Sequence, residues 1–362
     1  MTDLRIGAIG CGYWGPNLIR NFVEIPGAEV IAISDLQQEP MKRMQERFPR
    51  IEHSTRNYRD LFNMELDAVV IATPPATHYA IARDCLEHGL HVLVEKPITL
   101  NAEDAAGLIA IAEEHGRILM VGHTFEYNPA VRAIKEMIRS GELGDVYYID
   151  AIRASLGLFQ TKANVVWDLA PHDVSILRFL LDADPVSVNT HGSSCVQEGI
   201  EDVAYTTLMF PNNVLAHIRS SWLDPSKQRR ITVVGSKKMV IYDDVEPLEK
   251  VKVFDKGVKA IRHTDTYGEF SFAYHYGDVI IPYIRFEEPL RVQCQHFLDC
   301  IREGKTPQTD GHNGMRVVQV VEAAQRSMKN GGETVMVAQN GRAATADLHR
   351  TKEVGQQELA HA

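Results

Sequence analysis

The sequence lacks long hydrophobic runs and closely spaced cysteine pairs. No stretch reaches the ~18 apolar residues that a membrane-spanning helix requires. The N-terminal residues lead straight into a predicted strand, without the apolar segment of a signal peptide. None of the five cysteines belongs to a Cys-x-x-Cys motif, which argues against zinc ribbons and thioredoxin-like chemistry. We therefore expect a cytoplasmic protein with reduced thiols, no metal site and no association with membranes.

Clusters of positive charge are also scarce. The formal net charge is -10, and the short basic runs at 228–230 and 237–238 lie among strand-like residues. This composition argues against a nucleic-acid partner, although a few local arginines can still hold an anionic substrate. The 362 residues are too many for one typical hydrophobic core and indicate two domains.

The order of predicted elements divides the chain into three parts. Residues 1–122 alternate strands and helices, which predicts a Rossmann domain with a doubly wound parallel sheet, an α/β fold. Residues 123–338 contain many strand-like runs with short connections, which predicts an α+β domain with a large, mostly antiparallel open sheet. Residues 339–362 are polar and rich in small side chains, which predicts a disordered tail.

A glycine fingerprint lies between the first predicted strand and the first predicted helix. It consists of Gly10, Gly12 and Gly15, with Tyr13 and Trp14 inside the loop. The first glycine allows a tight turn, the second lets the backbone approach a pyrophosphate, and the third lets helix and strand pack closely. The strand–helix context therefore predicts a dinucleotide site.

Three further segments are expected to contact this cofactor: Asp35, the turn at 73–78, and Glu95 with Lys96. Asp35 follows the second strand, where a carboxylate accepts hydrogen bonds from the adenosine ribose and repels a 2′-phosphate. We therefore predict NAD as the cofactor rather than NADP, although Asp35 would also serve as a turn cap. Thr73, Pro74 and His78 follow another buried strand and face the same edge, where His78 would equally suit a helix cap.

The chemistry is predicted to lie at Glu95-Lys96-Pro97, which ends a further strand, and at Asp168 and His172. Asp168 and His172 are four residues apart and share one helical face. In hydride transfer, His172 would take the hydroxyl proton, Asp168 would orient the imidazole, and Lys96 would stabilise the oxygen. Lys96 is an alternative base. Each residue also has an alternative without catalysis: Lys96 would form a structural ion pair, and Asp168 would cap a helix.

These motifs occur in an order that resembles the glucose–fructose oxidoreductase/inositol dehydrogenase (Gfo/Idh/MocA) family. The resemblance adds the segment Gly-His-Thr-Phe-Glu-Tyr-Asn-Pro at residues 122–129 and covers residues 1–335. It implies an NAD-dependent oxidoreductase, paired through its large sheet as a homodimer or homotetramer. It also implies that Lys96, Asp168 and His172 lie at the substrate.

The segments around 123–131 and 167–173 resemble the branch that oxidises nucleotide sugars. This branch contains 3-dehydrogenases of UDP-N-acetylglucosamine and its uronate, which prepare a 3-keto sugar for an aminotransferase, as in lipopolysaccharide biosynthesis. The expected substrate contacts are Lys96, Tyr127, Arg153, Asn164 and His172. The alternatives are an inositol or free-sugar dehydrogenase, a 3-ketosugar reductase, and a regulator that senses NAD(H) without catalysis.

Overall fold

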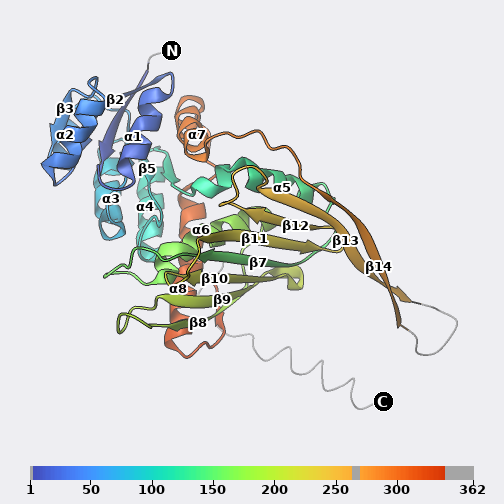
Figure 1. The fold of residues 1–362 in the computed structure, drawn as a ribbon. Coiled ribbons are helices and arrows are strands. Elements are labelled where there is room, and N and C mark those ends of the chain that lie inside the picture. The colour runs from blue at the N-terminus through green and yellow to red at the C-terminus, as the bar shows by residue number, and fades with distance from the viewer. Residues whose placement is uncertain (1–2, 263–269, 339–362) are drawn as a thin grey trace.

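The computed structural model describes residues 3–262 and 270–338 (Figure 1). The segment 339–362, for which the sequence predicts a disordered tail, lies outside the described residues. No helix within the described ranges is long and apolar enough to cross a membrane.

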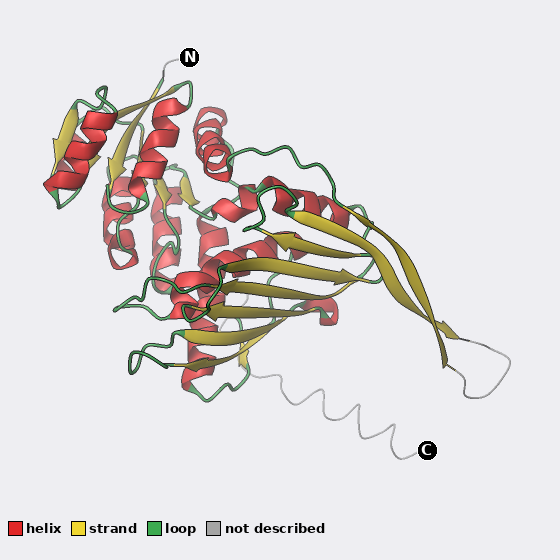
Figure 2. Ribbon diagram, in the orientation of Figure 1, coloured by secondary structure: helices red, strands yellow, loops and turns green. Residues whose placement is uncertain are grey.

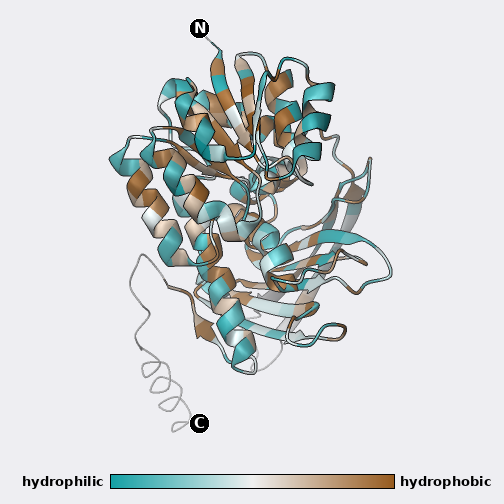
Figure 3. Ribbon diagram, turned by 90° about the vertical axis from the view of Figure 1, so that its left-hand side faces the viewer, coloured by the Kyte–Doolittle hydropathy of each residue, from teal (hydrophilic) through white to brown (hydrophobic). Residues whose placement is uncertain are grey.

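The N-terminal part contains a six-stranded sheet in the order β3-β2-β1-β4-β5-β6, in which every pair is parallel. This is the doubly wound order, so the predicted Rossmann fold is confirmed. The strands are hydrophobic and the outer faces of the surrounding helices are hydrophilic, as Figure 3 shows. The bounds are β1 (Leu4–Ile9), α1 (Gly15–Glu24), β2 (Ala28–Ser34), α2 (Gln38–Arg47), β3 (His53–Thr55), β4 (Ala68–Ile71), α3 (His78–Glu87), β5 (His91–Val94), α4 (Ala102–Glu114) and β6 (Leu119–Val121).

The second sheet has nine strands in the order β14-β13-β12-β11-β7-β10-β9-β8-β15. Its pairs are antiparallel except for β7 and β10, which are parallel. The predicted mostly antiparallel sheet is therefore confirmed. Its strands are β7 (Val146–Ala154), β8 (Ser187–Ser193), β9 (Val203–Met209), β10 (Leu215–Ser221), β11 (Gln228–Gly235), β12 (Met239–Asp243), β13 (Val251–Arg262), β14 (Phe270–Ile280) and β15 (Val335–Met336).

Three helices pack against this sheet, and Figure 2 shows them beside its strands. They are α5 (Pro129–Arg139), α6 (Val165–Leu181) and α8 (Gly311–Lys329). In β7, Ile149 and Ala151 are buried against α6 residues such as Val166, whereas Tyr148 and Asp150 alternate with them. Because neighbouring strand residues point to opposite faces, the sheet has one face under helices and one outer face.

The helix α7 (Pro289–Glu303) returns to the N-terminal part of the molecule. Phe297 joins the core that contains Phe22 of α1, and the two rings meet edge to face with centroids 6.3 Å apart. Arg20 forms an ion pair with Glu288 just before α7. The domain limits 1–122 and 123–338 stay a prediction, and the packing assigns α7 to the core of the Rossmann sheet.

Candidate active site

The glycine loop has the geometry that a dinucleotide phosphate requires. Gly10 has a φ of +97°, which is accessible mainly to glycine. A Cβ at Gly15 would overlap the carbonyl oxygen of Gly10, so loop and helix pack at their closest there. By contrast, a Cβ at Gly12 would meet no heavy atom of the described chain within 4 Å. This open space lies before the N-terminus of α1, where no side chain caps the backbone N–H groups. The loop therefore fits a pyrophosphate.

Asp35 lies at the carboxyl end of β2 and is fixed by two backbone N–H groups. Its Oδ2 accepts from Cys11 N at 2.7 Å, and its Oδ1 accepts from Gln37 N at 2.8 Å. The carboxylate is thereby held against the glycine loop, the place that the ribose of NAD requires. Turn capping and ribose recognition are compatible at this residue, because each oxygen has further lone pairs.

A hydrogen bond joins the glycine loop to the turn that carries Lys96. Trp14 Nε1 donates to Glu95 Oε1 at 2.7 Å. Burial raises the pKa of Glu95 to about 7, although Lys96 and the Trp14 donor oppose the shift. The lack of a side chain at Gly122 makes room for this carboxyl, since a Cβ there would lie 2.8 Å from Glu95 Oε1. Glu95 therefore couples the cofactor loop to the Lys96 turn.

His78 connects two turns that follow strands of the Rossmann sheet. Its side chain is buried, and its two ring nitrogens lie 2.8 Å from the carbonyl oxygens of Thr73 and Pro97. Both nitrogens therefore have partners within the described chain, and contact of His78 with the cofactor stays a prediction. The imidazole instead ties the turn at Thr73 and Pro74 to the turn after Lys96.

Lys96 contacts the helix that carries the other two candidate residues. Its Nζ donates to the backbone carbonyl of Asp168 at 2.9 Å. Pro171 lies inside α6 and has no N–H for the carbonyl of Trp167, so the helical ladder is interrupted one residue before Asp168. A helix cap at Asp168, the alternative without catalysis, would place Pro171 in the first turn. The helix instead begins at Val165, because Asn164 caps its N-terminus.

The carboxylate of Asp168 does not orient His172 in this structure. Its Oδ2 accepts from Trp222 Nε1 at 2.9 Å, at the end of β10. His172 Nδ1 is buried and has no hydrogen-bond partner among the described residues. The ring of His172 instead meets Phe125 edge to face, with centroids 5.2 Å apart. The predicted hydrogen bond between Asp168 and His172 is thus replaced by packing.

The charge states of Lys96 and His172 depend on their surroundings. Burial lowers the pKa of His172 well below its usual value, and the positive charges of Lys96 and Arg153 lower it further. Burial also lowers the pKa of Lys96, although Asp168 and Glu95 oppose the shift. His172 is therefore neutral at pH 7 and free to accept a proton. Both side chains are half-buried, so each keeps some exposed surface.

Three predicted substrate contacts are occupied by structural roles. Arg153 forms two hydrogen bonds with Asp173, at 2.8 and 2.9 Å, and both side chains are buried. Asn164 caps α6 and donates to Glu201 and Gln325. Tyr127 is buried, with its hydroxyl 3.1 Å from Thr309 Oγ1. All three side chains therefore have partners within the described chain, and their contact with a substrate stays a prediction.

Two residues without a role predicted from the sequence, His123 and Arg229, also lie in this region. His123 follows β6 and is buried, and both its ring nitrogens lack a partner among the described residues. Burial, together with Arg178 and Lys96, lowers the pKa of His123 to about 3. Arg229 of β11 contributes positive charge beside His172. The sequence does place His123 directly after a predicted parallel strand, which is the edge where such folds bind ligands.

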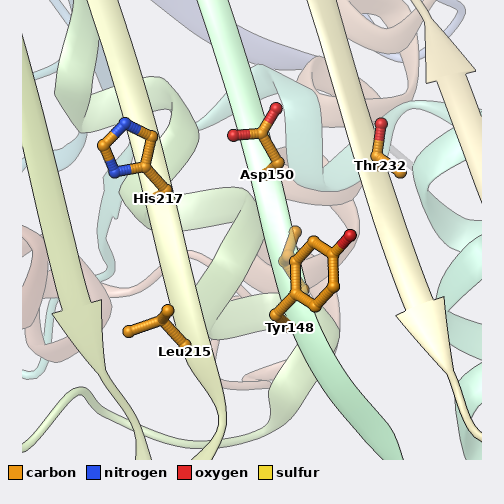
Figure 4. Close-up of a pocket in the computed structure, with 6 residues that line it drawn as sticks. Tyr148, Asp150, Leu215, His217 and Thr232 are labelled. Carbon is orange, nitrogen blue, oxygen red and sulfur yellow. The ribbon is translucent and has the colours of Figure 1, made fainter.

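A separate hollow of about 360 Å³ lies on the outer face of the large sheet, away from Lys96. Figure 4 shows its side chains on neighbouring strands: Tyr148 and Asp150 on β7, and Leu215 and His217 on β10. These residues alternate with buried ones under α6, so they belong to the opposite face of the sheet. This hollow therefore takes no part in the candidate active site.

Two family models match the chain. One describes an oxidoreductase family with an NAD-binding Rossmann fold and matches residues 4–123. The other describes the GFO/IDH/MocA C-terminal domain and matches residues 131–241. The chain belongs to the Gfo/Idh/MocA family. It is an NAD-dependent oxidoreductase, and its relatives act on hydroxyl groups of sugars.

Relatives within the Gfo/Idh/MocA family differ in substrate. UDP-N-acetylglucosamine 3-dehydrogenase of Acidithiobacillus ferrooxidans is 29% identical over 236 residues, covering 64% of this chain and 72% of the relative. Its solved structure has a TM-score of 0.75 at 24% identity and covers 91% of this chain and 99% of that chain. The NAD-dependent scyllo-inositol 2-dehydrogenase of Bacillus subtilis is 28% identical over 346 residues, which cover 91% of this chain and 95% of the relative.

Proposed function

We propose that this oxidoreductase converts the C3 hydroxyl of a nucleotide-linked amino sugar to a ketone, with NAD as the hydride acceptor. UDP-N-acetylglucosamine and its uronate are the proposed substrates. The single observation that carries the proposal is that Lys96 binds α6 one turn before a neutral His172, on a turn that Glu95 joins to the glycine loop. The similarity to UDP-N-acetylglucosamine 3-dehydrogenase supports the nucleotide sugar.

The proposed reaction separates one hydride and one proton. NAD supplies the chemistry of hydride acceptance when it is bound between the glycine loop and Asp35. The hydride leaves the C3–H bond, and the hydroxyl proton passes to neutral His172. The Lys96 ammonium lies beside the oxygen and stabilises the negative charge that develops there. A neutral Lys96 is the second candidate for the base, because burial lowers its pKa too.

Asp168 has a different proposed role from the one expected. Its carboxylate binds the Trp222 indole and its carbonyl binds Lys96, so Asp168 fixes the position of the lysine. Its negative charge opposes the loss of the Lys96 proton. We therefore assign Asp168 as a positioning residue, with Lys96 and His172 as the groups that contact the substrate.

A second candidate is a dehydrogenase of a free inositol or sugar. It is favoured by the similarity to scyllo-inositol 2-dehydrogenase, which extends over 91% of this chain. The same residues would also serve a 3-ketosugar reductase, with His172 or Lys96 donating the proton. The alternative of a non-catalytic sensor is set aside, because the family consists of oxidoreductases.

Stopped-flow measurement of NAD reduction distinguishes these candidates. The substrates are UDP-N-acetylglucosamine, its uronate, scyllo-inositol and myo-inositol, each with NAD in excess. Turnover of a nucleotide sugar with a 3-keto product, identified by NMR, supports the proposal. Turnover of the inositols alone assigns the enzyme to the second candidate.

We also propose a homodimer or homotetramer, paired through the outer face of the large sheet. This face exposes Tyr148, Tyr205 and Leu215, and the β13–β14 hairpin projects beyond the body of the molecule (Figure 1). Light scattering coupled to gel filtration tests this assembly, and a monomeric mass contradicts it. A 3-keto product would be the substrate of a sugar aminotransferase, which we propose as the next enzyme, as in lipopolysaccharide biosynthesis.

A further inference from the structure

Arg229 of β11 lies one strand away from Arg153 of β7. The two residues are Cα partners in the antiparallel pair formed by these strands. Directly opposite residues in such a pair project their side chains from the same face of the sheet. This face is the one under α6, because Arg153 reaches Asp173 of that helix. Arg229 therefore points toward the layer that carries His172.

A short series of contacts connects this position to the candidate base. The Arg153 guanidinium lies 4.6 Å from the centroid of the Phe125 ring. The Phe125 ring lies 5.2 Å from that of His172. Burial is the main cause of the lowered pKa values of His172 and Lys96, and the positive charge of Arg229 adds to it. Arg229 is thus within electrostatic reach of the groups that would hold the reacting hydroxyl.

The two arginines differ in how much of the guanidinium is available. Asp173 occupies Arg153 on two nitrogens, and the Arg153 side chain is 7% exposed. The Arg229 side chain is 38% exposed, and its one ion pair within the described residues is with Asp244, at 3.4 Å. Arg229 therefore keeps nitrogens free for a ligand, whereas Arg153 does not.

Asp244 neutralises Arg229 incompletely. Its Oδ1 lies 3.8 Å from Lys250 Nζ and accepts from the Tyr242 hydroxyl at 2.9 Å. One carboxylate thus serves two cations, Arg229 and Lys250. An anion bound here would restore the balance of charge.

We infer that Arg229 binds an anionic group of the substrate, and that this group is a carboxylate on the sugar that is oxidised. A ring carboxylate and a nucleotide diphosphate share the anionic oxygens that a guanidinium fork contacts. The ring carboxylate is favoured because Arg229 shares a sheet face with Arg153, whose guanidinium packs on Phe125 next to His172. This inference rests on the proposed function and narrows it to a hexuronate substrate.

The test compares Arg229→Gln with Arg230→Gln on two nucleotide sugars. Arg230 is the adjacent residue, is exposed, and points to the outer face of the sheet, so it is the matched control. For the uronate, Arg229→Gln is expected to lower kcat/KM about 10- to 150-fold, the effect of losing a charged hydrogen bond. For UDP-N-acetylglucosamine, which has no carboxylate, the expected fall is less than about 3-fold. Equal losses for both sugars indicate a diphosphate contact and overturn the inference, as does no loss for either.

A binding measurement keeps the inference separate from the proposed function. If the wild-type enzyme oxidises neither nucleotide sugar, the proposed function fails on its own. N-acetylglucosaminuronate and N-acetylglucosamine are then titrated by calorimetry into the NADH-loaded enzyme. Preference for the acid that is lost in Arg229→Gln and kept in Arg230→Gln supports the anion site. Equal binding of the two sugars to the wild type overturns it.

Discussion

The buried ion pair between Arg153 and Asp173 lends itself to a quantitative test by Asp173→Asn. The pair joins β7 to α6 directly beside His172, and its side chains are 7% and 2% exposed. The substitution leaves the guanidinium buried with at most a neutral acceptor. Breaking one partner of a buried pair costs about 3–5 kcal/mol, because the remaining charge keeps its desolvation penalty. That is a large part of the roughly 5–15 kcal/mol that stabilises a typical protein.

Urea unfolding followed by tryptophan fluorescence measures this loss. Trp167 and Trp222 lie close to the pair in the second part of the chain, and circular dichroism follows the whole molecule. Glu136→Gln is the matched control, because its ion pair with Arg139 is exposed on α5. The control is expected to unfold at the wild-type urea concentration.

A double variant separates the charge from the packing. Replacing Arg153 with Met and Asp173 with Leu removes both charges at similar volume, so most of the lost stability is expected to return. The reasoning is refuted if Asp173→Asn costs less than about 1 kcal/mol. It is equally refuted if the double variant is as unstable as the single one.

Three further predictions concern the cofactor loop, a buried carboxyl and a helix cap. Gly12→Ala is expected to fold normally and to raise the Kd for NAD roughly 5- to 150-fold, because its methyl fills the open space of the loop; unchanged NAD titration contradicts this. Burial raises the pKa of Glu126 to about 7 in the folded state. The stability that this shift contributes is complete below pH ~4.5 and is lost as the pH rises through 7. Between pH 4.5 and 8, the free energy of unfolding of Glu126→Gln, measured by urea titration, should therefore rise by about 3 kcal/mol relative to that of the wild type. Parallel pH profiles of the two proteins would contradict the raised pKa. Asn164→Ala should lose about 1 kcal/mol or more of stability with the cap but keep the wild-type KM for the sugar; a raised KM would return Asn164 to the substrate site.

The Rossmann half of the fold follows from local patterns in the sequence. Alternating strands and helices fix the doubly wound order, and that order brings the carboxyl ends of β1, β2, β4 and β5 to one edge. Gly10, Asp35 and Lys96 each follow such a strand, so their common location is predictable. The glycine spacing is equally local, since it depends on one turn and one helix start.

Partners that come from distant segments are not predictable in the same way. The carboxylate of Asp168 binds Trp222, 54 residues later, and nothing in the spacing of Asp168 and His172 indicates this competitor. Pro171 also misleads, because a proline normally marks a first turn, while Asn164 is the true cap. The antiparallel pair of β13 and β14 is likewise not predicted from the sequence.

The burial of Arg153 can be predicted from the alternation of side chains along its strand. Ile149 and Ala151 lie on the buried face of β7. Arg153 comes two residues after Ala151, so its side chain projects from the same face. The same alternation places Arg229 with Ile231 and Val233 on the inner face of β11. The identity of Asp173 as the partner still depends on how α6 lies across the sheet, which single-sequence patterns do not determine.

Single-turnover hydride transfer in Lys96→Met tests whether Lys96 takes part in the chemistry. Enzyme in excess over the sugar substrate is mixed with saturating NAD, and formation of NADH is followed by stopped flow. The account predicts an NAD affinity within about 3-fold of wild type and a hydride-transfer rate reduced roughly 10²- to 10⁴-fold. Hydride transfer at the wild-type rate with normal NAD binding would contradict the assignment of Lys96 to the chemistry.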